Sequence, residues 1–167
     1  MKISVLYHSV SGNTKHMAEV IAESMNAVAG VEAKAFSIDA VDETFAKESR
    51  CVVAGCSTYM AGPSAEFYTY MEKEMGKLEL AGKLGGAFST AQYAHGGGEL
   101  VIRSILDHMM TKGMLTYSVG SSHGKPVIHL GPEAVATAGN TEMLRQYEEI
   151  FRFYGQHMAE KALELFG

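Results

Sequence analysis

The fold is decided by residues 3–15, which read ISVLYHSVSGNTK. An apolar run over residues 3–7 gives way at once to hydroxyl side chains and a glycine, and a helical pattern begins at Asn13. This succession predicts a strand, a tight loop and the N-terminus of a helix. Backbone N–H groups at a helix start lack intrahelical partners and carry the positive end of the helix dipole. The stretch therefore predicts a loop that binds the phosphate of a nucleotide.

Strands and helices alternate along the rest of the chain. Gly30 is expected to end the first helix, and Ser64 to cap a later one. This alternation requires right-handed crossovers, so we expect an α/β protein in which helices cover both faces of a parallel sheet. At 167 residues the chain suits a single domain, residues 1–167. The expected strands are 3–7, 31–38, 51–55, 84–89 and 114–119; the expected helices are 13–29, a short one within 39–49, 64–77, one ending near 112, and 141–165, with an irregular segment at 121–140.

The loops that follow the first, third and fourth expected strands are rich in hydroxyl, glycine and aromatic residues. In open parallel sheets, ligands bind outside the carboxyl ends of the strands. One of these loops could hold a phosphate while the other two hold a planar ring. A Walker phosphate loop is absent, since residues 76–83 have the wrong spacing, and the glycines do not form a dinucleotide fingerprint. A mononucleotide is the expected ligand.

Composition excludes several other classes of protein. The net charge of −5 and the pI near 5.8 argue against a nucleic-acid surface. No apolar run is long enough to span a membrane, and the N-terminus lacks the pattern of a signal segment. Cys51 and Cys56 share one expected strand and are expected to be free thiols, which favours a reducing compartment and a cytoplasmic protein. The seven histidines show no paired ligand spacing, so no metal site is expected.

Two groups of motifs carry a resemblance to known families. Residues 9–14, SVSGNT, resemble the phosphate loop of the flavodoxins. Residues 55–71, 82–85 with 88–89, 95–99 and 113–114 are similar, in that order, to the WrbA-type NAD(P)H:quinone oxidoreductases. The resemblance implies a flavodoxin-like three-layer α/β/α fold with a five-stranded parallel sheet of order 2-1-3-4-5. It also implies FMN as cofactor and electron transfer from NAD(P)H to a quinone or a similar acceptor.

The resemblance also implies which residues contact FMN. His95 is in addition the candidate catalytic residue, because it directly precedes the glycines of the fourth-strand loop. Each assignment has a plainer alternative: residues 9–14 could form an ordinary turn and helix cap, the two tyrosines could be packing residues, and the histidine could be merely solvated. The implied phosphate contacts are Ser9, Ser11, Gly12, Asn13 and Thr14; the implied ring contacts are Ser57, Thr58, Tyr59, Met60, Ala61 and Gly62 on one edge and Ser89, Thr90, Gln92, Tyr93 and His95 on the other.

Two functions remain open at this point. The quinone oxidoreductases carry an insertion after the second strand and a His-His pair where this chain has Thr111-Lys112. The alternative is a flavodoxin-type electron carrier without its own nicotinamide site, although such carriers are more acidic around the flavin. The partner would be NAD(P)H in the first case and a redox protein in the second. Met109, Met110 and Met114 are expected to fill the core, or else to contribute to a homo-oligomer interface.

Overall fold

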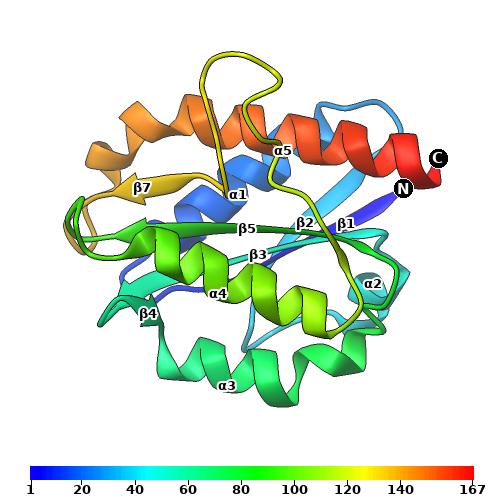
Figure 1. Ribbon diagram of the computed structural model, residues 1–167, viewed down its shortest axis with the longest axis horizontal. Coiled ribbons are helices and arrows are strands. Elements are labelled where there is room, and N and C mark those ends of the chain that lie inside the picture. Colours follow the sequence, from blue (N-terminus) through cyan, green and yellow to red (C-terminus); the bar gives the residue numbers. More distant parts are fainter.

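The computed structural model describes all residues, 1–167, and contains one sheet with helices on both faces (Figure 1). No helix combines the length and the apolar character needed to cross a bilayer. The strands are β1 Lys2–His8, β2 Glu32–Ser37, β3 Cys51–Tyr59, β4 Gly62–Pro63, β5 Leu84–Ala91, β6 Leu115–Thr116 and β7 Glu133–Val135; the helices are α1 Asn13–Asn26, α2 Glu43–Glu48, α3 Ala65–Lys73, α4 Gly98–Thr111 and α5 Arg145–Phe166, with 3-10 turns at Met75–Leu78 and Thr141–Leu144.

The main path of the sheet has the order β2-β1-β3-β5-β6, and every pair along it is parallel. When the strands of this path are numbered in chain order, the arrangement is 2-1-3-4-5, so the expected fold is confirmed. Two short strands lie off the path: β4 pairs antiparallel with β3, and β7 pairs parallel with β5. The carboxyl ends of β1, β3 and β5 therefore meet at one edge of the sheet.

The fifth strand differs from the prediction. The prediction of a continuous strand at 114–119 was wrong, because only the two-residue strand β6 forms there, where it pairs with the start of β5. Val119 has a φ of +68° and Gly120 a φ of +70°, so the chain leaves the extended conformation at this point. It returns to the same edge of β5 as β7, opposite Ser89–Ala91. Gly131 makes this return possible, since a β carbon there would lie 2.1 Å from the carbonyl oxygen of Ala87.

Two apolar clusters cover the two faces of the sheet. One joins α1 and α5 to the sheet through residues such as Met17, Ile21 and Phe151. The other joins α3 and α4 to the opposite face, and Figure 1 shows these two pairs of helices on opposite sides of the strands. Gly155 lets α5 approach α1 closely, because a β carbon there would lie 2.7 Å from the Ile21 carbonyl oxygen. These packed layers hold the sheet edge rigid beneath its loops.

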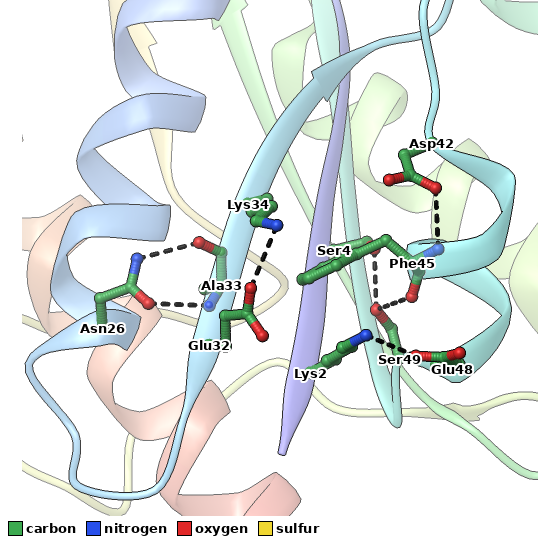
Figure 2. A network of polar contacts seen from close by, with 10 residues as sticks. All are labelled: Lys2, Ser4, Asn26, Glu32, Ala33, Lys34, Asp42, Phe45, Glu48 and Ser49. Carbon is green, nitrogen blue, oxygen red and sulfur yellow. Dashed lines mark hydrogen bonds and ion pairs between the residues drawn. The ribbon is translucent and has the colours of Figure 1, made fainter.

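Several helix ends differ from the sequence-based expectation, while the cap at Ser64 is confirmed. Ser64 Oγ accepts a hydrogen bond from the Phe67 N–H at 3.2 Å. The first helix ends at Asn26 and not at Gly30, because the Asn26 side chain forms two hydrogen bonds with the backbone of Ala33 in β2 (Figure 2). The helix expected to reach residue 77 ends at Lys73, where a 3-10 turn follows. These boundaries depend on contacts between elements, which local patterns do not contain.

Candidate functional site

The loop between β1 and α1 leaves the start of α1 without a side-chain cap. Gly12 occupies the N-cap position with a φ of +97°, and no side chain accepts from the first turn of the helix. Ser9 Oγ instead accepts a hydrogen bond from the Gly12 N–H at 3.2 Å, within the loop itself. An ordinary capped turn does not describe this geometry. The first N–H groups of a 14-residue helix therefore stay available to an anion.

Two buried side chains at the start of α1 tie the candidate phosphate loop to the neighbouring loops. The hydroxyl oxygens of Thr14 and Thr90 lie 2.9 Å apart and share a hydrogen bond. Asn13 Nδ2 donates to the carbonyl oxygen of Thr137 at 2.9 Å, while Asn13 Oδ1 is buried without a partner. Both side chains therefore join the start of α1 to the carboxyl-edge segments of β5 and β7.

The second loop is a two-residue turn that joins β3 to β4. Its residues, Met60 and Ala61, both have positive φ values, 48° and 60°. The pairing of Tyr59 with Gly62 closes the turn, and Thr58 Oγ1 donates to the Thr90 carbonyl oxygen at 3.0 Å. Positive φ is the conformation that tight hairpin turns require, and residues other than glycine adopt it at a cost in free energy. This turn projects a fully exposed Met60 side chain at the rim of the site.

The third loop follows β5 and places three glycines at the start of α4. Tyr93 and His95 are exposed on this loop. A β carbon at Gly97 would lie 2.7 Å from the Ala61 β carbon, and one at Gly98 would lie 2.1 Å from Glu133 Oε1. Glycine is thus needed because the helix start packs against both the β3–β4 turn and β7.

A small cavity of about 100 Å³ that opens to solvent lies between these loops. It brings together many of the predicted contacts, whereas Tyr93, His95 and Met60 lie outside it on exposed parts of their loops, and Ser89 is completely buried in the sheet. Ser9, Gly12, Thr14, Ala61 and Gly62 also do not line it. The lining residues are Ser11, Asn13, Ser57, Thr58, Tyr59, Thr90, Ala91, Gln92, Ala136 and Ala138.

The segment after β7 was missing from the predicted site. Ala136 and Ala138 line the cavity, and Thr137 accepts the hydrogen bond from Asn13. The available signal was the alternation of Val135 and Thr137, two β-branched residues, with alanines over residues 134–138. Because β7 has only three residues, this signal is too short to predict a strand by itself.

The ionisable groups around the cavity do not form an acid–base or nucleophile set. Burial raises the pKa of the Cys56 thiol to about 12, so the thiol stays protonated and is a poor nucleophile. Burial, and then the charge of Glu99, raise the pKa of Glu133, whose Oε1 is buried without a hydrogen-bond partner. The arrangement supplies backbone donors, hydroxyl groups and aromatic rings, which suits binding of a phosphorylated planar ligand.

The fold and this edge define a parallel α/β protein with a cavity between three strand-end loops, and comparisons with known proteins identify its family. The flavodoxin family model matches residues 5–98. A flavodoxin of Clostridium saccharobutylicum is 39% identical over 166 residues, which cover 99% of this chain and 100% of that protein. The chain therefore belongs to the flavodoxin family.

More distant relatives include enzymes. An NAD(P)H dehydrogenase (quinone) of Chromohalobacter salexigens is 28% identical over 201 residues, covering 99% of each chain. Among solved structures, a flavodoxin, WrbA-like protein of Agrobacterium tumefaciens has a TM-score of 0.78 at 23% identity, and covers 98% of each chain. An archaeal flavodoxin has a TM-score of 0.75 at 24% identity, covering 98% of this chain and 99% of the other. The structural matches establish the shared fold.

Proposed function

We propose that this chain binds FMN and transfers electrons between redox partner proteins, as a flavodoxin-type carrier without its own nicotinamide site. The observation that carries this proposal is the 39% identity to a flavodoxin over nearly the whole of both chains, together with a cavity between three strand-end loops whose rim is exposed. A bound flavin supplies the redox chemistry, so a carrier needs only to hold the ring and leave its edge accessible to a partner.

The residues present fit FMN at its two ends. The uncapped start of α1 offers backbone N–H groups for the phosphate, next to the hydroxyls of Ser9 and Ser11. Asn13 Oδ1, an acceptor that is buried without a partner, adjoins the cavity and would accept a hydrogen bond from a hydroxyl of the ribityl chain, while the backbone N–H of Asn13 would serve the phosphate. The ring would lie between the β3–β4 turn and the loop after β5, where Tyr59 and Tyr93 offer aromatic surface.

Residue by residue, the proposed contacts remain those that the resemblance implied. Ser9, Ser11, Gly12, Asn13 and Thr14 would bind the phosphate. The two other loops would orient the ring and exclude water from one face of it, and His95 would lie on the exposed rim. The ring contacts proposed are Ser57, Thr58, Tyr59, Met60, Ala61, Gly62, Ser89, Thr90, Gln92, Tyr93 and His95.

The second candidate function is an FMN-dependent NAD(P)H oxidoreductase that reduces a quinone. Its support is the 28% identity to a quinone dehydrogenase over nearly the whole of both chains. That match extends over 201 aligned residues, more than this chain contains, so the enzyme has segments that this chain lacks. The 39% identity to a flavodoxin of matching extent favours the carrier.

Stopped-flow spectroscopy of FMN-loaded protein separates the two functions. A carrier should keep its oxidised flavin spectrum when mixed with NADH or NADPH, yet lose it when a chemical reductant such as dithionite is added. Rapid bleaching by either nicotinamide, followed by reoxidation with a quinone, would establish the oxidoreductase instead. The FMN proposal has its own test: the isolated protein should be yellow and release FMN on denaturation. A colourless protein that fails to bind added FMN at micromolar concentration would overturn it.

A further inference from the structure

The outer face of α4 carries exposed apolar residues at both ends of the helix. Leu100, near the N-terminus, is 58% exposed, and Met110, near the C-terminus, is 47% exposed. Between them lie Arg103 and Asp107, whose side chains are about half exposed. The inner face is buried against the sheet in the ordinary way. The outer face is therefore an unpartnered surface on a helix that lies between α3 and β5 (Figure 1).

These four residues are placed symmetrically along the helix. Leu100 and Met110 lie five positions to either side of Ile105, a rise of about 7.5 Å each way. Arg103 and Asp107 lie two positions to either side of Ile105, about 3 Å each way. When a second copy of the helix runs antiparallel to the first, each apolar residue lies level with an apolar residue of the other copy. Each charged residue lies level with a residue of opposite charge. Such a face is complementary to an antiparallel copy of itself.

We propose that two copies of this chain associate through the outer faces of α4, with the two helices antiparallel about a two-fold axis at the level of Ile105. Arg103 of one copy then lies level with Asp107 of the other, and Leu100 lies level with Met110. Within one chain, Arg103 donates to Asp107 Oδ1 through Nε at 2.8 Å. The two Nη groups of each arginine stay available for the second copy, so four charges form one alternating network.

The surroundings of α4 suit this packing. One groove beside the helix is lined by Tyr68 of α3 together with Leu100, Arg103 and Asp107. Another, on the other side, is lined by Leu130 together with Arg103 and Met110. The exposed residues of α4 thus form a ridge between two grooves, which is the geometry by which helices interlock.

The charge pattern favours a second copy over a redox partner on this face. Partner proteins that meet transiently are commonly steered by surface patches of one sign. The outer face of α4 instead carries one positive and one negative side chain, so its net charge is zero. These two charges pair with a surface on which the same charges occur in reversed order, as in an antiparallel copy of the helix. The antiparallel arrangement also brings Met110 of the second copy next to the start of α4, where the loop after β5 ends.

Paired charge reversals test the proposal in FMN-loaded protein, with sedimentation velocity over micromolar to submillimolar concentrations as the measurement. Wild-type protein should form a dimer that weakens at high salt, since exposed charges are screened. In R103D, the new aspartate of one copy lies level with Asp107 of the other, so two negative charges face each other. In D107R, the new arginine lies level with Arg103 of the other copy, so two positive charges face each other. Each variant should raise the dimer dissociation constant by at least about tenfold.

An equimolar mixture of R103D and D107R provides the decisive measurement. Each chain of the mixed pair meets opposite charges on the other, so a one-to-one heterodimer should form although each variant alone is monomeric. An ion pair between residues 103 and 107 of the same helix cannot explain heterodimer formation, because in each variant these two residues carry the same charge. The pair Glu43 and Lys47 on α2 has the same spacing and similar exposure, so E43K and K47E serve as matched controls and should not change association.

Three outcomes would overturn the proposal. Wild-type protein could remain monomeric throughout the concentration range, which would leave the face to some other partner. The R103D and D107R proteins could dimerise as well as the wild type, which would place the interface elsewhere. Finally, the mixture could stay monomeric while thermal unfolding shows both variants to be folded.

Discussion

Gly97 and Ala61 pack directly against each other, although they belong to different loops of the candidate site. A β carbon at Gly97 would lie 2.7 Å from the Ala61 β carbon and 2.9 Å from its α carbon. Ala61 sits in the β3–β4 turn at a φ of +60°, and Gly97 precedes α4 at a φ of +91°. The two loops proposed to hold the flavin ring therefore support each other.

Gly97→Ala should weaken FMN binding by about tenfold or more, because the new methyl group must displace the β3–β4 turn. Fluorescence titration of the apoprotein with FMN measures the dissociation constant. Gly30→Ala is the matched control, since Gly30 has a nearly equal φ of +86° and nothing within 4 Å of its β-carbon position. Both variants bear the cost of positive φ, about 1 kcal/mol, but only the first disturbs a loop.

Ala61→Gly should restore part of the binding in the Gly97→Ala background, because it removes the methyl group 2.7 Å from the new side chain but leaves the α carbon of residue 61 at 2.9 Å. It also relieves the positive φ at residue 61. If Gly97→Ala bound FMN as tightly as Gly30→Ala does, the contact between the loops would have no part in binding.

Thr14→Val should weaken FMN binding by about tenfold while leaving riboflavin binding nearly unchanged, because its hydroxyl is assigned to the phosphate. Thr90→Val is the matched control, since it removes the other member of the same buried hydrogen bond but no proposed phosphate contact. Both variants should lose about 1 kcal/mol of unfolding free energy from that bond. An equal loss of FMN and riboflavin affinity in Thr14→Val would mean that this threonine acts only through Thr90.

The sequence pattern was sufficient to predict a parallel α/β sheet and the edge at which the loops gather, whereas the strand order was implied by the resemblance to the flavodoxins. Strongly apolar strands alternating with helices leave few alternatives, and parallel strands bring their carboxyl ends to one side. The cap at Ser64 was equally predictable, because it depends on a side chain and the N–H group three residues later. These features are local, or follow from connectivity rules.

The features that escaped prediction depend on contacts between distant residues. Ala61 adopts a positive φ without the glycine that usually signals such a turn, and its packing partner is 36 positions away at Gly97. The fifth strand breaks at Val119, a buried β-branched residue at positive φ, which no propensity predicts. Its second half, β7, is held by pairing with β5 more than by its own three residues.

Glu133→Gln should stabilise the protein at neutral pH and reduce the pH dependence of its stability. Burial, and then Glu99, raise the pKa of Glu133 above 4.5, so the folded state binds a proton that the unfolded chain has released. The stability of the wild type should therefore fall, relative to the variant, as the pH rises from 4.5 through the raised pKa. Urea unfolding of both proteins across this pH range gives the comparison. Glu99→Gln should change the free energy of unfolding in the same direction but by less. A stability difference between wild type and Glu133→Gln that grows towards low pH would contradict the raised pKa of Glu133.

Lys83→Met should lower the free energy of unfolding by about 2–4 kcal/mol. Lys83 is almost fully buried, and its Nζ donates to the carbonyl oxygens of Ala46, Lys47 and Leu78 at 2.8 to 2.9 Å. These carbonyls lie at the ends of α2 and the 3-10 turn, and although Ala46 also accepts from the Ser49 N–H, methionine would remove the Nζ donor from all three. Lys73→Met, at an exposed position, controls for the change of residue type. Equal urea midpoints for the two variants would show that water replaces the ammonium group at little cost.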